Sequence, residues 1–600
     1  MSDSGGDFDV AILGGGLAGL TLGLQLKAAR PETSIVIAEK RVGPAPEAAF
    51  KVGESTVEVS TNYFADVVGM RDHLDAEQLP KCGLRFFFPA GDNSDIALRV
   101  EYGSPAIPPV HSYQLDRGRF ENELAARNVK AGNTVLDGAR VQEIDLEGND
   151  LEGERKRVTI TRGEETSELT SRWVVDAAGR AGLLKRKLGL AREVGHHVNS
   201  AWFRLAGGLD IDEWSDDEQW HRRMTAPGLR ALSTNHLCGQ GYWVWLIPLS
   251  SGPISIGIVA DPRFHPFERI NTQEAAMAWL AEHEPQLAQA LKDRQEQIED
   301  FLRVEDFAMG CERQFFADRW CLVGEAGAFA DPFYSPGSDY IALGNTFATD
   351  LIVRDLDGED ISARADAHDE RFQRMFKTTL SYYEGQYGIW RNAQVMNAKI
   401  TADYFYYWAV PALLFFHRKL TDLEFMAEVQ PLLDRAMRLT PILQRFFREW
   451  DELDHREWLG AFSPPTAFPQ LPQRHLDLHS GMDDERLRAQ LAENVELYEA
   501  LAVTMFAKAV ESLPATAATA AASAATGGDP GAVKLDAETK INPYAISLDP
   551  ERWEADGLHD GSGYSPAEVA DRLRVRSFWM EQLVPRRFRP PTQGTEAAHA

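Results

Sequence analysis

A glycine-rich turn close to the start of the chain limits what this sequence can fold into. The apolar run over residues 7–13 (DFDVAIL) ends at three consecutive glycines, and residues 17–29 follow with the composition of a helix. The next apolar run covers residues 34–38 (SIVIA). A strand, a glycine turn, a helix and a second strand in this order form the β-α-β unit that binds a dinucleotide.

The residues of the turn have separate tasks in such a unit. Gly14 permits the tight turn, Gly16 lets the backbone approach a pyrophosphate, and Gly19 lets the helix pack closely against the strand. Glu39 closes the second strand about 20 residues further on, where an acid accepts hydrogen bonds from a ribose. The predicted dinucleotide contacts are therefore Glu39 and the turn itself, which consists of Gly14, Gly15, Gly16, Leu17, Ala18 and Gly19.

Composition excludes several classes of partner. The formal net charge of −29 disfavours binding to nucleic acid or to an anionic membrane, because both are themselves negative. The four cysteines have no C-x-x-C spacing and fit reduced thiols better than disulfides or a zinc site, so no metal is expected. The first residues carry no basic segment of an export signal, which predicts a cytoplasmic protein.

One apolar segment complicates the prediction of a soluble protein. Residues 404–416 (YFYYWAVPALLFF) are strongly apolar and aromatic. They are too few to span a bilayer, which needs roughly 20 residues, and Pro411 interrupts them. A buried helix or the wall of an apolar pocket is the favoured interpretation. A weak contact with a membrane surface through residues 404–416 is the alternative.

Two further stretches resemble the flavoprotein monooxygenases and favour FAD over a nicotinamide. Residues 173–180 (WVVDAAGR) are expected to form a strand that runs into a turn of small residues. Residues 321–332 (CLVGEAGAFADP) are expected to form a strand and an acidic loop before a helix whose N-terminus points at the flavin. The FAD-binding domain is therefore expected to be discontinuous, over residues 1–200 and 300–355.

The predicted fold is α/β (α+β overall), a Rossmann-like FAD-binding domain with an antiparallel sheet as a roof and a helical C-terminal cap. Residues 242–249 and 254–259 flank a turn of Ser-Ser-Gly-Pro and are expected to form a hairpin. The remaining regions are expected to be an antiparallel-sheet region over 200–300, a helical substrate cap over 356–512, a flexible linker over 513–535 and a tail over 536–600.

Four motifs further along the chain indicate one family. They are Val52-Gly53-Glu54-Ser55-Thr56, Lys81 before a short apolar strand, Trp243-Val244-Trp245-Leu246-Ile247-Pro248, and Asp331-Pro332-Phe333-Tyr334-Ser335-Pro336-Gly337. Together with the glycine turn they resemble the flavin-dependent halogenases of the tryptophan-halogenase-like type, within the FAD-dependent monooxygenase flavoproteins. The resemblance covers residues 7–350 and extends loosely into the helical region.

The resemblance implies a reaction and a role for Lys81. In this family reduced FAD reacts with oxygen, and the flavin hydroperoxide oxidises a halide to hypohalous acid. The acid then travels through a tunnel to a lysine beside an electron-rich substrate. Lys81 stands where that lysine is expected. Its ammonium group can hydrogen-bond the acid, or its amine can form a haloamine, so that the halogen is delivered at one position.

The family pattern also implies roles for the other motifs. Glu54 and Ser55 resemble the strap that connects the flavin site to the lysine, although Glu54 also suits the start of a helix. Asp331 and Ser338 are expected to contact FAD. Trp243 and Trp245 are two residues apart on a strand and project to one face, which the resemblance places beside the flavin or the tunnel. A tryptophan pair in an ordinary sheet core is the alternative for that face.

The loop after Asp331 departs from the family pattern. Tryptophan halogenases carry an acid followed by Ser-Thr-Gly, and the N–H groups of the Thr and Gly hold chloride. Here Tyr334, Ser335, Pro336 and Gly337 occupy those positions. Pro336 has no N–H, and losing a charge-assisted hydrogen bond to a buried anion costs about 1.5–3 kcal/mol, which would weaken or shift a halide site at Pro336 and Gly337. Tyr334 in place of the acid favours a phenolic, pyrrolic or carrier-bound substrate over free tryptophan.

The source of reduced flavin is expected to be another protein. Residues 176–180 (DAAGR) lack the pattern of hydroxylases that bind NADPH themselves, and no second nucleotide fingerprint is present, so a separate flavin reductase is expected to supply FADH2. The leading hypothesis is an FADH2- and O2-dependent halogenase with a halide co-substrate and a small-molecule or carrier-protein-bound aromatic substrate. The alternatives are a flavin-dependent monooxygenase or geranylgeranyl-reductase-like oxidoreductase without halide chemistry, and a protein in which FAD is only structural.

Overall fold

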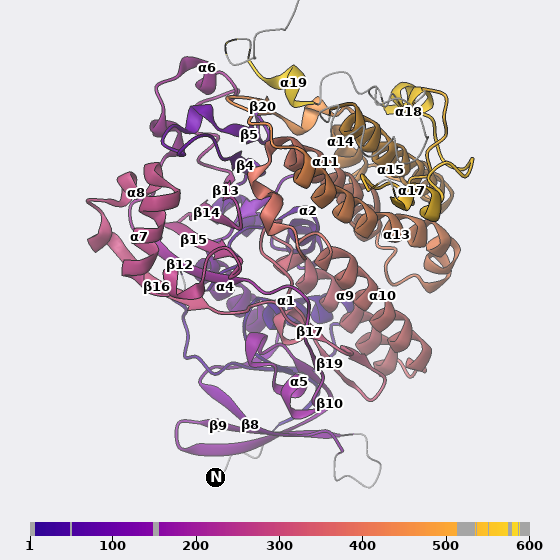
Figure 1. Ribbon diagram of the computed structural model, residues 1–600. Coiled ribbons are helices and arrows are strands. Elements are labelled where there is room, and N and C mark those ends of the chain that lie inside the picture. Colours follow the sequence, from indigo (N-terminus) through magenta and orange to yellow (C-terminus); the bar gives the residue numbers. More distant parts are fainter. Residues whose placement is uncertain are drawn as a thin grey trace, which may run out of the picture.

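The computed structural model describes residues 6–48, 51–147, 155–512, 535, 537–549, 551–573, 579–585 and 587. The linker predicted over 513–535 lies outside the described residues except for residue 535. The described part contains two eight-stranded sheets and a large helical region beside them (Figure 1). This arrangement confirms the predicted fold class.

The first sheet carries the glycine turn. Its order is β18-β19-β10-β1-β2-β7, and β8 and β9 extend it from β10. β1 pairs in parallel with both β2 and β10, so its run of apolar residues is covered on both faces of the sheet. The strands are β1 (Asp7–Leu13), β2 (Ile35–Ala38), β7 (Thr134–Leu136), β8 (Ala139–Asp145), β9 (Lys156–Arg162), β10 (Glu165–Asp176), β18 (Phe315–Phe316) and β19 (Trp320–Leu322).

Helix α1 (Leu17–Ala29) connects β1 to β2 and has the bounds that the sequence predicts. It packs against α4 (Arg117–Lys130) and against α9 (Gly337–Leu356), which belongs to a much later part of the chain. The predicted β-α-β unit is thereby confirmed, and α9 is brought close to the glycine turn.

The second sheet is assembled from distant parts of the chain in the order β16-β12-β15-β14-β13-β4-β5-β20. The predicted hairpin is confirmed as β14 and β15. The sheet is neither wholly antiparallel nor confined to residues 200–300, because β4 pairs in parallel with β13 and β20 pairs in parallel with β5. Pairing between strands so far apart leaves no local pattern in the sequence. The strands are β4 (Leu84–Phe88), β5 (Val100–Tyr102), β12 (Asn199–Leu205), β13 (Thr234–Gly239), β14 (Tyr242–Pro248), β15 (Ile254–Ala260), β16 (Ile298–Val304) and β20 (Phe462–Ser463).

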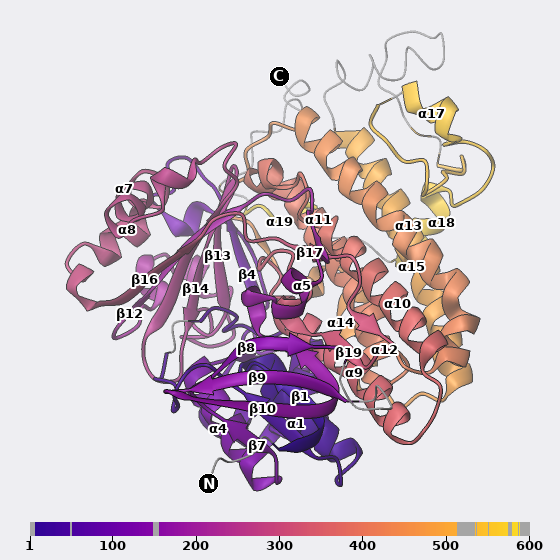
Figure 2. The same ribbon diagram turned by 90° about the horizontal axis from the view of Figure 1, so that it is seen from below.

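The two faces of the second sheet bury different cores. Val244 and Leu246 face the cluster that includes α7 (Gln273–His283) and α8 (Pro285–Leu291). Trp243 and Trp245 face the large cluster shared with the first sheet and the helical region, so the prediction that they share one face is confirmed. Figure 2 shows the second sheet between α7 and α8 on one side and the helical region on the other.

The helical region packs the apolar segment 404–416 inside. This segment ends α11 and continues through a π-helical turn into α12, and most of its side chains are buried. A membrane contact through residues 404–416 is therefore wrong, because these side chains face the protein interior. No helix in the described ranges is long and apolar enough to cross a bilayer. The main helices after α9 are α10 (Ser362–Leu380), α11 (Ala393–Tyr407), α12 (Leu413–Phe416), α13 (Leu423–Leu453), α14 (Gln470–Asp477) and α15 (Asp484–Ser512).

The described part of the C-terminal tail packs against this helical region. Helix α18 (Pro566–Leu573) lies against α15, beside α17 (Glu551–Asp556) in Figure 1. Trp553 is buried, and the hydroxyl of Tyr564 donates to Glu499 of α15 at 2.9 Å. The tail therefore extends the helical region on the side away from the first sheet.

Candidate functional site

The glycine turn leaves no room for side chains. A Cβ atom on Gly19 would lie 2.0 Å from the carbonyl oxygen of Gly14, and one on Gly14 would lie 2.4 Å from that of Ala177. Gly14 also has a φ of +122°, which favours glycine. Gly16 is the N-cap of α1, and only the Lys51 ammonium nitrogen lies within 4 Å of where its Cβ would be. Exposed N–H groups at an open helix start fit a pyrophosphate.

Glu39 is held beside this turn. Its Oε2 atom accepts a hydrogen bond from the N–H of Gly15 at 2.8 Å, and its Oε1 atom accepts one from the N–H of Arg41 at 2.9 Å. The carboxylate thus lies at the end of β2, next to the start of α1, as a ribose-binding acid requires.

Glu54 forms a buried ion pair with the second sheet. Its Oε1 atom pairs with Arg204 of β12 at 2.6 Å, and Arg204 also pairs with Asp300 at 2.7 Å. Burial raises the pKa of Glu54, and the Arg204 charge opposes that rise. Glu54 therefore anchors the segment before Ser55 to the second sheet.

Lys81 lies in the protein interior and lines a pocket. The side chain is 0% exposed, and its Nζ atom donates to Ser55 Oγ at 2.8 Å and to the carbonyl oxygen of Thr56 at 2.6 Å. Neither acceptor is charged. Burial lowers the pKa of Lys81 to about 7, opposed by the charges of Glu58 and Asp339.

Ser55 joins Lys81 to the loop that precedes α9. The hydroxyl of Ser335 donates to Ser55 Oγ at 3.0 Å, and Thr234 Oγ1 lies 2.8 Å from the same atom. Ser335 adopts the left-handed conformation with φ +59° and is followed by Pro336 at the N-cap of α9. One hydroxyl group thus separates the lysine from the predicted halide loop.

Helix α9 begins at Gly337, and its first backbone hydrogen bond runs from the N–H of Tyr340 to the carbonyl oxygen of Pro336 at 3.0 Å. The N–H groups of Gly337, Ser338 and Asp339 precede that bond and lie at the positive end of the helix dipole. Pro336 contributes no N–H here, as the sequence predicts.

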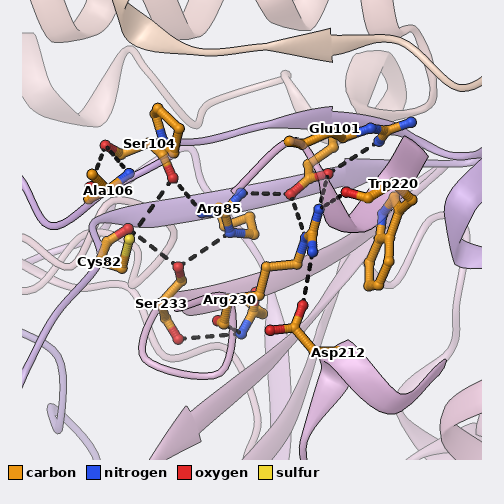
Figure 3. A network of polar contacts seen from close by, with 12 residues as sticks. Cys82, Arg85, Glu101, Ser104, Ala106, Asp212, Trp220, Arg230 and Ser233 are labelled. Atoms are coloured by element: carbon orange, nitrogen blue, oxygen red, sulfur yellow. Dashed lines mark hydrogen bonds and ion pairs between the residues drawn. The ribbon is translucent and has the colours of Figure 1, made fainter. Parts of the chain in front are cut away.

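A buried network of arginines fixes the backbone that follows Lys81 (Figure 3). Arg85 of β4 lies 2.5 Å from Glu101 Oε1 and donates to Ser233 Oγ at 3.1 Å. Ser233 in turn donates to the carbonyl oxygen of Cys82 at 3.2 Å, and Arg230 pairs with Glu101 at 2.9 Å. The three charged side chains are fully buried, so this network holds the start of β4 in one position.

The pocket has a volume of about 220 Å³ and is formed by residues from seven parts of the chain. Its walls are aromatic and apolar, with a few carboxyl, amine and hydroxyl groups. Lys81 and Pro336, which the sequence places in separate motifs, both line it. The polar and ionisable residues of the lining include Glu58, Tyr334, Asp339, Tyr382, Tyr383, Asp403, Tyr407 and His475.

Three carboxylates of the pocket were not predicted from the sequence. Two of them are paired with basic side chains. Glu58 Oε1 lies 3.0 Å from His475 Nε2, and Asp403 Oδ2 lies 2.6 Å from Lys399 Nζ. Burial opposes ionisation of Glu58, but the hydrogen bond with His475 lowers its pKa overall. The third carboxylate, Asp339, has no such cation among the described residues. An acid in the first turn of a helix is an ordinary helix-start signal, so the sequence gives no separate hint of a site.

Tyr334 occupies the position of the expected acid and contacts one of these carboxylates. Its hydroxyl donates to Asp403 Oδ2 at 2.9 Å, and Gln444 Nε2 donates to Asp403 Oδ1 at 2.8 Å. The signal that could have revealed this group is the i, i+4 pair of Lys399 and Asp403 within an aromatic helix.

Asp331 is fully buried and bonded within the protein. Its Oδ2 atom lies 2.7 Å from His196 Nε2 and accepts a hydrogen bond from the Tyr387 hydroxyl at 2.6 Å. Trp243 Nε1 donates to the same Tyr387 hydroxyl at 3.3 Å, and its ring lies edge-on to Phe333 with centroids 5.3 Å apart. Asp331 and Trp243 therefore connect the flavin loop, the second sheet and the helical region. A direct contact of either residue with FAD stays a prediction.

The FAD binding domain family matches residues 7–327 of this chain. Among known proteins, the flavin-dependent halogenase chlA of Dictyostelium discoideum is 28% identical over 393 residues, which cover 60% of this chain and 63% of that protein. The tetracycline 7-halogenase of Kitasatospora aureofaciens is 26% identical over 357 residues, which cover 55% of this chain and 60% of that protein. The matched segment is thus less than two thirds of the length of either relative.

The fold is similar to that of solved flavoproteins. The crystal structure of halogenase PltM in complex with phloroglucinol and FAD superposes with a TM-score of 0.58 at 15% identity. The superposition covers 82% of this chain and 96% of that one. At this identity the likeness describes the fold alone.

Proposed function

Since this chain belongs to the FAD binding domain family and, within it, to the flavin-dependent halogenases, we propose that it halogenates an electron-rich aromatic compound. The proposed reaction consumes reduced FAD, oxygen and a halide. Lys81 delivers the hypohalous acid that forms from them to the substrate.

FAD is the cofactor of this oxidoreductase, and the glycine turn fits it. When bound and reduced, it supplies the oxidation of the halide by oxygen. The turn at Gly14–Gly19 receives the pyrophosphate at the start of α1, and Glu39 receives a ribose hydroxyl. These residues bind and orient the cofactor, and a separate flavin reductase is proposed as the source of its reduced form.

The observation that carries the proposal is the position of Lys81. Lys81 lines the pocket, and one serine lies between its enclosed amine and the loop before α9. Hypohalous acid is indiscriminate when free, so a selective halogenase needs a group that holds it next to the substrate. A lysine with a pKa of about 7 can serve as the ammonium donor or as the amine at neutral pH.

The pocket supports a small aromatic substrate. Its volume of about 220 Å³ lies below the roughly 300–1,000 Å³ of sites for drug-sized ligands. Tyrosine and tryptophan rings on its walls suit a flat, electron-rich ring. A phenol or a pyrrole, free or attached to a carrier protein, is the proposed substrate class.

Pro336 favours a second candidate function, in which the same flavin chemistry hydroxylates the substrate. The proline removes one N–H from the loop that would hold the halide. Without a bound halide, the oxygen atom would go to the substrate and Lys81 would have no part in the chemistry.

The test supplies FAD-loaded protein with a flavin reductase, NADH, oxygen and bromide or chloride. Monochlorodimedone and a panel of phenols and pyrroles serve as acceptors, with products identified by their isotope pattern. We expect a halogenated product with the wild type and its loss in Lys81→Ala. Lys156→Met is the control, because this buried lysine also donates to a carbonyl oxygen, that of Leu146 at 2.7 Å, but lies outside the pocket lining. Hydroxylated product that is indifferent to halide and to Lys81 would overturn the proposal.

A further inference from the structure

We propose that Asp339 is the base that removes the hydroxyl proton of a phenolic substrate while the halogen bonds to its ring. This step rests on the proposed function and adds to it the residue that activates the acceptor. It also selects the phenols from the proposed substrate classes.

Asp339 lies where a substrate hydroxyl can reach it. It belongs to the first turn of α9, is 6% exposed and lines the same pocket as Lys81. The N–H of Ser60 donates to its Oδ1 atom at 2.8 Å, and the hydroxyl of Tyr407 donates to its Oδ2 atom at 2.6 Å. Each oxygen of a carboxylate accepts more than one hydrogen bond, so both retain capacity for a donor in the pocket.

Lys81 and Asp339 are positioned by the two ends of one short segment. Thr56 accepts a hydrogen bond from Lys81 at 2.6 Å, and Ser60 donates to Asp339 at 2.8 Å. Glu58 lies between them in the chain and also lines the pocket. A ring in this pocket therefore meets an amine and a carboxylate that one piece of backbone holds in register.

Asp339 differs from the other pocket carboxylates in having no cation beside it. Glu58 is paired with His475 and Asp403 with Lys399, whereas no basic side chain of the described residues lies within ion-pair distance of Asp339. Burial raises the pKa of Asp339 to about 7, and the nearby charge of Glu58 adds to this rise. A carboxylate that takes up a proton near neutral pH has the property that a general base needs.

Titratable groups from several surrounding elements influence the ionisation of Asp339. Glu58 and Tyr407 act on it from α2 (Glu58–Asn62) and α11, and Lys81 acts from the irregular segment just before β4. Tyr383 lies close enough for its own ionisation to be opposed by the Asp339 charge. Among these groups only Lys81 is cationic, and its amine is already bonded to Ser55 and Thr56.

Three tyrosines that line the pocket also point to an oxygen-bearing ligand. The hydroxyl groups of Tyr340, Tyr382 and Tyr383 are buried and have no hydrogen-bond partner among the described residues. Burying a polar group without a partner costs about 1–3 kcal/mol, which an oxygen substituent on the ligand would recover.

The proton and electron balance of the step is complete. Asp339 takes the phenolic proton, and an electron pair of the ring forms the carbon–halogen bond as the halogen–oxygen bond of hypohalous acid breaks. The leaving oxygen receives a proton from the Lys81 ammonium group and departs as water. The ring carbon then returns a proton to the Lys81 amine, and Asp339 returns its proton to the oxygen, which gives the halogenated phenol.

The test compares a phenol with its methyl ether, which has no hydroxyl proton to lose. The FAD-loaded wild type, Asp339→Asn and Asp339→Glu are assayed with bromide between pH 6 and pH 10. We expect Asp339→Asn to lower the ratio of phenol to ether turnover by roughly 100-fold at pH 7, the size of a general-base contribution. The ratio should recover as rising pH ionises the phenol itself, and Asp339→Glu should restore part of it at pH 7.

The outcomes separate this step from the function on which it rests. An unchanged ratio, or equal losses on both substrates, would overturn the role of Asp339 as a base. Glu58→Gln is the matched control, because it removes a paired carboxylate from the same pocket and should cause no loss that alkaline pH reverses. If the wild type itself fails to brominate monochlorodimedone, the proposed function is wrong, and the step is withdrawn with it.

Discussion

Two fully buried lysines have opposite surroundings: Lys81 lines the pocket, and Lys399 pairs with Asp403, a carboxylate that lines it. Lys399, on α11, has its Nζ atom 2.6 Å from Asp403 Oδ2 and 2.6 Å from Gln444 Oε1. Among the described residues, Lys81 donates to a serine hydroxyl and a backbone carbonyl alone. Burial lowers the pKa of both, but the Asp403 charge opposes this effect at Lys399 directly.

The difference separates a structural group from a reactive one. A carboxylate in contact with a buried lysine favours its charged form and offsets part of the cost of burial. A buried lysine whose direct acceptors are neutral lacks a carboxylate in contact to offset that cost, so it keeps a labile proton. Such an arrangement destabilises the fold and is typical of a group that serves the chemistry.

Removing Lys399 should have the largest effect on stability. Lys399→Met leaves Asp403 buried without its cation, which costs about 3–5 kcal/mol of unfolding free energy. Urea unfolding of the FAD-loaded protein measures the loss. The double variant Lys399→Met with Asp403→Asn should recover at least half of this lost unfolding free energy. A double variant that is no more stable than Lys399→Met would show that Lys399 does not act as the counter-charge of Asp403.

Replacing Pro336 tests whether the loop that Ser55 connects to Lys81 binds the halide. Pro336→Ala restores an N–H at the start of α9, and a charge-assisted hydrogen bond to a buried anion is worth about 1.5–3 kcal/mol. We expect the halide concentration for half-maximal product to fall by about 10-fold or more. Pro465→Ala, at another proline of the pocket, should leave it unchanged. Equal values for both variants would place the halide elsewhere.

Removing Lys81 should change stability in the opposite direction to removing Lys399. The pKa of Lys81 falls from 10.5 to about 7 on folding, so the cost of its burial is complete below pH 7. Between pH 7 and 10.5 the folded protein loses this proton before the unfolded chain does, and the stability of the wild type therefore rises with pH. Lys81→Met should stabilise the fold by about 1–2 kcal/mol at pH 6.5, after the lost hydrogen bonds are subtracted.

The stability gain of Lys81→Met should become smaller towards pH 9.5, because Lys81 of the wild type is then largely neutral. Unfolding curves at the two pH values measure it. Lys419→Met serves as the control, because its hydrogen bonds with Asp484 and Asp422 raise the pKa of that lysine, so its removal should not stabilise the fold at pH 6.5. A Lys81→Met variant that is destabilised at both pH values would remove the distinction between the two lysines.

Much of the fold could be predicted because its signals are local. The glycine turn, the bounds of α1 and the hairpin of β14 and β15 each depend on a few neighbouring residues. The parallel pairing of β4 with β13 could not be predicted, because nothing near residue 84 specifies a partner near residue 234. The same non-local pairing carries Lys81 into the core.

The site divides in the same way. Family motifs gave Lys81, Ser55 and the loop at Pro336, and the structure brings these three together. Asp339, Glu58 and Asp403 lie on helices whose polar positions look ordinary in sequence. Their shared pocket forms only when α2, α9 and α11 pack together. The spacing of these residues in the sequence therefore does not predict the pocket.

The central claim is that Lys81 holds the oxidised halide for the substrate. The most direct measurement is the ratio of halogenated product to FADH2 oxidised in a single turnover, compared between wild type, Lys81→Met and Lys399→Met. We predict a ratio that falls at least 100-fold in Lys81→Met while FADH2 oxidation continues, and a ratio in folded Lys399→Met within a few-fold of the wild type. Product formation by Lys81→Met at the wild-type ratio would contradict the account.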